Sequence, residues 1–242
     1  MAAHFGWSLR ILRRVVRLFL PKYQFNCEDL PNLDQPTIFV SHHENLKGPL
    51  RLMIWTPVFM RPWVFAKLTQ FKSCYKHFSS YTFYKRFGLP QVLAKCVAWP
   101  AARISVFFLK SARSIPVYRQ SKKIRLTFRE SVASLQAGQP IAIFPDIDYQ
   151  NSDQSIGELY EGFLTIDQLY FKKYGQRIQF IPLVANKHKQ EFEIGRPLRF
   201  TGRMKFRKER ELMAQALQDE LNRLADPSLE QLEENESQLS VK

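Results

Sequence analysis

The chain has 242 residues, and its 36 Lys and Arg against 22 Asp and Glu give a formal net charge of +14 at pH 7. At 45% hydrophobic and 14% aromatic residues it is long and apolar enough to bury a sizeable core, which excludes a disordered protein. Three scattered cysteines, Cys27, Cys74 and Cys96, exclude a disulfide framework and a four-ligand zinc site. The positive charge implies an anionic partner: nucleic acid, an anionic membrane or a phosphorylated substrate.

Residues 1–22 predict a basic amphipathic helix that ends at Pro21. Its apolar run is too short and too often interrupted by arginine to span a bilayer, and a secretory signal would carry its charges before the apolar core. The pattern favours a helix in the lipid boundary with its arginines at anionic headgroups, the alternative being a helix packed on the domain. The arginines share one face because they stand at i, i+3, i+4 and i+7: Arg10, Arg13, Arg14 and Arg17.

Alternating strands and helices predict an α/β domain with a mostly parallel sheet flanked by helices. The strand-like runs are rich in Ile, Val and Phe and read as buried on both faces: Thr37–Ser41, Trp63–Lys67, Ile115–Tyr118, Ile141–Phe144 and Ile178–Val184. The helical patterns are Pro49–Trp55, Lys122–Gln136 with a C-cap at Ala137-Gly138, Leu159–Lys173 and Lys205–Leu224.

Two further segments complete the predicted organisation. Cys96–Ala102 followed by Ile104–Leu109 is either a shallow membrane-embedded or substrate-tunnel element, or a buried helical pair. The end of the chain from Asp226 has five acidic residues and one lysine, which is typical of a solvated tail. The predicted division is therefore a helix over 1–22, an α/β domain over 23–225 and an acidic tail over 226–242.

The strand Thr37–Ser41 runs directly into a pair of histidines, His42 and His43. Open α/β sheets bind their ligands at the carboxyl ends of the strands, where this pair lies. Histidine has the side-chain pKa best matched to general-base catalysis near neutral pH. A histidine pair in a loop is also compatible with a purely structural role.

Four sequence blocks follow one another in a characteristic order. They are Ser41–Pro49 (SHHENLKGP), Arg113–Arg119 (RSIPVYR), Ile143–Asp146 (IFPD) and Phe180–Val184 (FIPLV). Over roughly Pro36 to Arg199 this order resembles the glycerolipid acyltransferase family, whose best-known members are the lysophosphatidate acyltransferases. In that family the blocks read NHx4D, GxIPVxR, FPEGTR and a Val-Pro or Ile-Pro strand.

The chain departs from the family pattern at two places. If His43 is the family histidine, the family aspartate is replaced by Gly48; if His42 is, it is replaced by Lys47. We favour His43, because Gly48-Pro49 then stands where the family has Asp-Pro. Either Glu44 or Asp146 is the candidate substitute for the lost carboxylate. In block three Ile147-Asp148-Tyr149 replaces Gly-Thr-Arg, so a phosphate-binding arginine is missing. With His-Glu in block one and no acid at its end, the chain resembles a bacterial branch of the family.

The resemblance implies transfer of an acyl group from a thioester, acyl-CoA or acyl-carrier protein, to a hydroxyl of a lysophospholipid or glycerol-phosphate-like acceptor. It implies no metal and no cofactor besides the thioester co-substrate. His43 is the candidate base, with Glu44 or Asp146 orienting it, or with Asp146 holding the acceptor's hydroxyls. Four residues are candidates for substrate binding: Arg119 as a phosphate clamp, Arg113 and Lys47 as sources of positive potential, and Gly162 as a point of close backbone approach.

The expected partners are an anionic membrane surface, the acceptor lipid and the thioester donor. We expect the cytoplasmic face of the membrane, because thioester donors are cytosolic and no export signal is visible. The alternative is a non-catalytic acyltransferase fold that binds lipid or acts as a scaffold. No nucleic-acid partner is expected, because zinc-knuckle, helix-turn-helix and RNP-like motifs are missing. His188 is placed in a hairpin turn and is assigned no chemistry.

Overall fold

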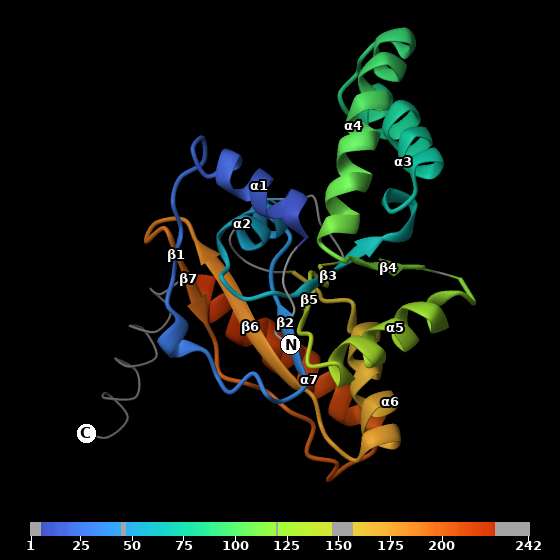
Figure 1. The fold of residues 1–242 in the computed structure, drawn as a ribbon. Coiled ribbons are helices and arrows are strands. Elements are labelled where there is room, and N and C mark those ends of the chain that lie inside the picture. The colour runs from blue at the N-terminus through green and yellow to red at the C-terminus, as the bar shows by residue number, and fades with distance from the viewer. Residues whose placement is uncertain (1–5, 45–46, 120, 147–156, 226–242) are drawn as a thin grey trace.

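A computed structural model describes residues 6–44, 47–119, 121–146 and 157–225 (Figure 1). Within these residues the strands form one sheet in the order β1-β7-β6-β2-β5-β3-β4. Strands β2 to β6 pair parallel with their neighbours, and β7 pairs antiparallel with β6, which confirms the α/β prediction. The strand bounds are β1 Gln24–Phe25, β2 Thr37–Val40, β3 Arg61–Phe65, β4 Ile115–Val117, β5 Ile141–Ile143, β6 Gln179–Asn186 and β7 Glu191–Ile194.

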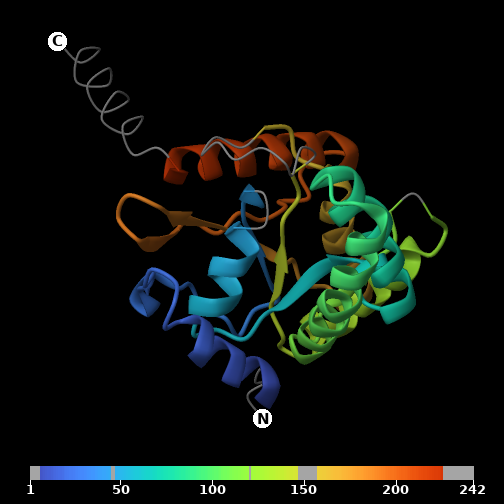
Figure 2. The same ribbon diagram turned by 90° about the horizontal axis from the view of Figure 1, so that it is seen from above.

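The central strands bury both faces, because successive side chains of a strand point to opposite sides of the sheet. Ile38 and Val40 of β2 pack under α5 (Ile124–Gln136), α6 (Thr165–Tyr174) and α7 (Phe206–Ala225). Phe39 lies between them in sequence and packs toward α2 (Lys47–Trp55) on the other face. Figure 2 shows α7 and α2 on opposite sides of the sheet.

The predicted elements are confirmed with small shifts, and the two unpredicted strands are short and lie at one edge. β1 has two residues, and β7 alternates Glu with Phe and Ile, so neither forms a long apolar run. The pattern over Leu159–Lys173 divides into a 3₁₀ turn, η5 (Glu161–Leu164), and then α6. Gly138 follows α5 with φ of 65°, a left-handed conformation that suits glycine after a helix end.

A helical hairpin projects from the sheet between β3 and β4 (Figure 1). After a 3₁₀ turn, η3 (Ala66–Leu68), it consists of α3 (Phe71–His77), the π-helical segment η4 (Phe78–Arg86) and α4 (Gln91–Ser111). Residues 96–109 therefore lie in one helix with Pro100 inside it, and not in the buried helical pair that was one of the two readings. By length and composition α4 alone among the described helices is apolar enough to cross a membrane.

The N-terminal helix α1 (Trp7–Val16) packs on the domain, so its arginine face is not wholly available to lipid headgroups. Arg13 is buried and donates to the backbone oxygens of Ile54 and Thr56, and the Arg17 guanidinium donates to Ile54 at 2.7 and 3.0 Å. These carbonyls end α2, where cations satisfy orphan acceptors. Burial, with Arg17 nearby, lowers the pKa of Arg13 to about 10.

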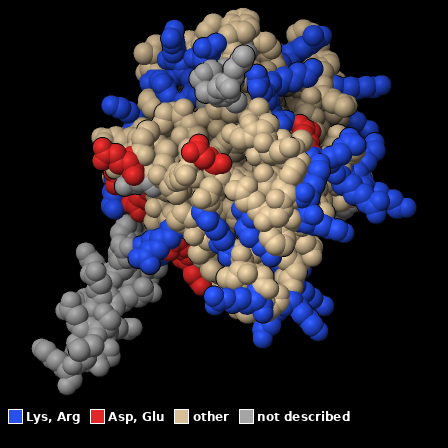
Figure 3. Space-filling model, turned by 60° about the horizontal axis from the view of Figure 1, so that its bottom comes forward, with Lys and Arg blue, Asp and Glu red and all other residues tan. Residues whose placement is uncertain are grey.

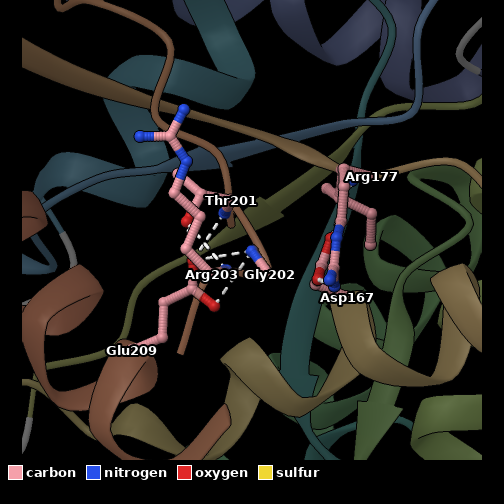
Figure 4. A network of polar contacts seen from close by, with 7 residues as sticks. Asp167, Arg177, Thr201, Gly202, Arg203 and Glu209 are labelled. Carbon is pink, nitrogen blue, oxygen red and sulfur yellow. Dashed lines mark hydrogen bonds and ion pairs between the residues drawn. The ribbon is translucent and has the colours of Figure 1, made fainter. Parts of the chain in front are cut away.

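Two buried carboxylates, one on α6 and one on α7, bind neighbouring segments of the chain (Figure 4). Asp167 of α6 pairs with Arg177 at 2.6 Å and accepts a hydrogen bond from the Ile178 N–H at 2.9 Å, just before β6. Burial raises the pKa of Asp167 despite these donors. Glu209 of α7 accepts hydrogen bonds from the backbone N–H and the hydroxyl of Thr201 and from the Gly202 N–H.

We expect Glu209→Gln to destabilise the fold at neutral pH and to be silent in acid. Burial opposes ionisation of Glu209, but the hydrogen bonds from Thr201 and Gly202 outweigh it and lower its pKa. A lowered pKa contributes stability above the unfolded-state value of 4.5, and that stability is lost as the pH falls through the folded-state pKa. The expected loss at pH 7 is about 1–2 kcal/mol in urea unfolding. Glu211→Gln, on an exposed position of α7, is the control, and an equal loss at pH 7 and pH 3 would contradict the account.

Candidate active site

The candidate residues gather at the carboxyl edge of the parallel strands. His42 and His43 follow β2, Asp146 follows β5, and Arg119 follows β4. β2 and β5 are neighbours, with Val40 opposite Ile143, so the segments that follow these two strands leave the sheet side by side. The sequence alone could not show this adjacency, because the two strands are about a hundred residues apart.

Asp146 joins the two strand ends through both of its carboxylate oxygens. Oδ1 lies 3.1 Å from Nδ1 of His42, and both side chains are only 4% exposed. Oδ2 accepts a hydrogen bond from the backbone N–H of His43. The aspartate of block three thus orients the imidazole of His42 and the main chain of His43. The expectation of a contact between Asp146 and the His43 ring is replaced by this arrangement.

The two histidines differ in their access to a substrate. His42 is buried, whereas His43 is half-buried and its ring meets Phe144 edge-on at a centroid distance of 6.1 Å. A general base must come within hydrogen-bond reach of the proton that it removes. His43 is therefore the less buried of the two residues, and the ring of His42 is the one that contacts the carboxylate of Asp146.

Glu44 is engaged elsewhere, which corrects its expected role as the orienting carboxylate. It is buried, and its Oε2 lies 2.7 Å from Arg51 of α2 and 3.4 Å from Lys187 after β6. Its φ of 41° places it in the left-handed region, so the chain turns sharply after the histidines. That turn directs the carboxylate to the two cations, and the structure records no contact between it and either imidazole.

Gly48 is the position expected to correspond to the family aspartate if His43 is the family histidine, and the structure leaves no room there for a side chain. A Cβ at this position would lie 2.0 Å from the carbonyl oxygen of His42. The closeness arises because the turn folds back on itself, with the Gly48 N–H donating to the His43 carbonyl at 3.3 Å. The local backbone therefore leaves no space for a carboxylate at this position.

Arg119 and Gly162, both expected to bind substrate, meet at Tyr160. The Arg119 guanidinium lies 5.8 Å from the centre of the Tyr160 ring. The Tyr160 N–H donates to the Pro145 carbonyl at 2.8 Å, next to Asp146. A Cβ on Gly162 would lie 2.3 Å from the Tyr160 ring, so this glycine makes room for the tyrosine and not directly for a substrate. The sequence analysis assigned no role to Tyr160, which contacts both Arg119 and the main chain beside Asp146.

The other two candidate cations lie in different places. Lys47 is exposed at the first turn of α2, on the same edge as the histidines. Arg113 precedes β4, and its guanidinium lies 5.8 Å from the ring of Phe59, which precedes β3. Because one strand cannot place both of its ends at one edge, Arg113 lies at the edge opposite Arg119. The expected part of Arg113 in the site is not supported.

Some predictions lie outside the described residues, including the block-three departure Ile147-Asp148-Tyr149 and the tail 226–242. Among the residues that the structure describes, no three His, Cys, Asp or Glu side chains are grouped so that they could hold a metal ion. His188 lies in the turn between β6 and β7, and its N–H donates to Asn186 Oδ1 at 3.0 Å.

An aspartate at position 48 should destabilise the protein and should not improve the site. Gly48→Asp, and equally Gly48→Ala, must move the His42 backbone, and we expect a loss of about 2–4 kcal/mol in unfolding free energy. Gly157→Ala is the matched control, because nothing lies within 4 Å of a Cβ there. A Gly48→Asp protein as stable as the wild type in thermal unfolding would refute this explanation of the missing carboxylate.

The fold is similar to that of a solved acyltransferase. The 1-acyl-sn-glycerophosphate (LPA) acyltransferase PlsC from Thermotoga maritima superposes with a TM-score of 0.52 at 13% sequence identity, over 90% of this chain and 78% of that chain. No protein-family model matches the chain, and no curated protein sequence matches it. At this identity the likeness establishes a shared fold, an α/β architecture in which helices flank a mostly parallel sheet.

Proposed function

We propose that this protein transfers an acyl group from a thioester to a hydroxyl of a lysophospholipid or glycerol-phosphate-like acceptor. The observation that carries the proposal is the carboxyl-edge cluster, in which Asp146 holds both the His42 ring and the backbone of His43. The acyltransferase fold and the order of the four sequence blocks support the same reaction. The chemistry needs a base, a site for anionic groups and access for acyl chains.

His43 is our proposed general base. As the acceptor hydroxyl attacks the thioester carbonyl, the imidazole takes its proton and a carbon–oxygen bond forms. The carbon–sulfur bond then breaks, and the proton passes to the departing thiolate to give a free thiol. Positioning of the two substrates contributes as much as the base, because the uncatalysed reaction is bimolecular. Asp146 and His42 act on His43 through the main chain, which makes them positioning residues.

Arg119 is our proposed phosphate clamp. A guanidinium binds phosphate oxygens in a bidentate manner, and Tyr160 holds this one beside block three. β4 lies three strands from β2, roughly 14 Å along the sheet edge at the usual strand spacing. Lys47 adds positive potential near the histidines. An acceptor or donor phosphate bound at Arg119 therefore reaches the base through the length of the substrate and not by direct contact.

The proposed partners are an anionic membrane surface, the acceptor lipid and acyl-CoA or acyl-carrier protein. The cytoplasmic face of the membrane is proposed because thioester donors are available there. The competing function is a lipid-binding scaffold with the same fold. The observation that favours it is that the carboxylate of Asp146 pairs with the ring of the buried His42.

His43→Gln should lower turnover by about 10²–10⁴-fold without changing the melting temperature. The measurement is thiol release from acyl-CoA or acyl-carrier protein with lysophosphatidate as acceptor. His188→Gln, on the exposed turn, is the control and should keep full activity. Asp146→Asn and His42→Gln should lose less activity and some thermal stability, because they act through the backbone.

Three outcomes would overturn parts of this assignment. No turnover by the wild type with any donor or acceptor, together with lipid binding that survives His43→Gln, establishes the scaffold. Full activity in His43→Gln removes His43 as the base. If a folded His42→Gln protein loses activity while His43→Gln keeps it, the base is His42.

Arg119→Ala should raise KM for a phosphate-bearing acceptor roughly 10- to 100-fold, the value of a charge-assisted contact, with a smaller effect on kcat. Arg119→Lys should raise KM less than Arg119→Ala, since lysine keeps the positive charge but cannot bind phosphate oxygens in a bidentate manner. Arg113→Ala is the matched control, because this arginine belongs to the same sequence block but lies at the opposite sheet edge. Equal changes in KM for Arg119→Ala and Arg113→Ala would mean that neither residue binds the phosphate specifically.

A further inference from the structure

Within the hairpin of α3, η4 and α4, the helix α4 buries small side chains and exposes large apolar ones. The residues that α4 buries stand four apart, on one stripe: Ala94, Ala98, Ala102 and Val106. Such a stripe lets a neighbouring helix approach closely, which is typical of helices that pack within lipid. The segment η4 buries no residue in the structure.

The outer surface of this hairpin exposes many large apolar side chains. Trp99 and Ile104 of α4 are 53% and 55% exposed, and Val92 near the start of the helix is 77% exposed. Single exposed apolar residues are ordinary, but a face of this extent on one element marks an interaction site. We define the outer face by its exposed members: Tyr81, Tyr84, Phe87, Val92, Leu93, Val97, Trp99, Ile104 and Phe107.

The charged side chains of the hairpin are all basic. Residues 45–129 contain no Asp or Glu and 17 Lys and Arg. Within the hairpin, Arg103 lies 4.6 Å and 5.1 Å from the ring centres of Phe71 and Trp99, which shields its charge at the middle of α4. Basic side chains are also spread over the face shown in Figure 3, so charge alone does not select a docking face. The outer face is where apolar surface and positive charge coincide.

The position of the cations shows how the hairpin meets a bilayer. Lys85 and Arg86 lie near its tip, and Lys95 follows on the first turns of α4. Each such charge at the centre of a bilayer costs about 2.5–3.5 kcal/mol, which opposes entry tip first. A helix that lies in the headgroup boundary buries its apolar face and leaves its cations with anionic headgroups.

The start of α1 lies at the base of the hairpin, and α1 also exposes apolar side chains. α1 packs against the end of α4, where Gly6 and Leu9 donate from their backbone N–H groups to Ser111. Trp7 is 67% exposed, and Leu18 and Phe19, after the helix, are 81% and 80% exposed. The cations that face outward here are Arg10 and Arg14, since Arg13 and Arg17 are bound to α2.

We propose that the outer face of the α3–η4–α4 hairpin, with α1 beside it, docks in the plane of one leaflet of an anionic phospholipid bilayer. α4 is then a boundary helix and not a transmembrane span, although its length and composition would permit either. This proposal specifies the membrane contact of the proposed function, and it requires no acyl transfer.

The first test is binding of the full-length protein to vesicles without any acyl substrate. We expect Val92→Asp combined with Ile104→Asp to lower binding to vesicles of equal parts phosphatidylglycerol and phosphatidylcholine at least about tenfold. Leu169→Asp combined with Leu212→Asp is the matched control on α6 and α7, where two similarly exposed apolar residues take the same charge change. Binding by the hairpin variant equal to the wild type overturns the proposal, and so does an equal loss in the control.

The second test measures depth with a fluorescent label on Cys96, which is exposed on α4. In a Cys27→Ser protein the label reaches Cys96, because Cys74 is buried and burial raises the pKa of its thiol to about 11. We expect a blue shift on vesicle binding and stronger quenching by a nitroxide near the headgroups than by one at the bilayer centre. Stronger quenching from the centre establishes a span, and an unchanged spectrum overturns docking by this face.

The label on Cys27 in a Cys96→Ser protein is the control, and it should not respond to vesicles. Both tests distinguish failure of docking from failure of the proposed reaction. A protein that binds vesicles through the hairpin but never releases thiol retains the docking surface and loses the enzymatic assignment. A protein that turns over dispersed substrates but ignores vesicles loses only the docking surface.

Discussion

The candidate site depends on one buried carboxylate. Asp146 lies just beyond β5 and binds the two residues that follow β2, one through its ring and one through its main chain. This contact holds the loop after β2 against the neighbouring strand end, and the antiparallel bridge from Asp146 to Leu159 holds the following segment beside it. Through Tyr160 the same segment reaches Arg119, so the parts of the site that come from three strands share one anchor.

The two buried carboxylates near the end of β2, Glu44 and Asp146, each have their own hydrogen-bond or charge partners. Glu44, four residues beyond β2, is surrounded by Arg51 and Lys187, while Asp146 is left to the histidines. A buried ionised group is tolerated when charges or hydrogen bonds compensate its lost solvation. Glu44 and Asp146 therefore cannot exchange roles. The left-handed turn at Glu44 and the side-chain-free position at Gly48 decide which of them faces the imidazoles.

The α4 helix of the hairpin is packed differently from the helices of the domain. In the domain, large apolar residues such as Phe39, Phe163 and Phe180 are fully buried between the sheet and its helices. In α4, three alanines and a valine are buried, and large apolar residues such as Val92, Trp99 and Ile104 are exposed. A helix that buries small residues and exposes large ones gains little from packing in water. Its apolar surface is stabilised only when another apolar phase covers it.

The sequence by itself determined the α/β class, five of the strands and the helices outside the hairpin, because apolar periodicity is a local property. It also placed His43, Asp146 and Arg119 at strand ends, which is where ligands bind in such sheets. Tertiary structure decided which ends are neighbours, and hence that Asp146 meets His42, that Glu44 belongs to Arg51 and that Arg113 lies at the far edge. The sequence pattern could not show which arginines of the N-terminal helix face the domain. Arg13 is buried because the carbonyls at the end of α2 accept its hydrogen bonds. Contacts between residues distant in the chain depend on strand order and backbone turns, and neither is encoded in a short stretch of sequence.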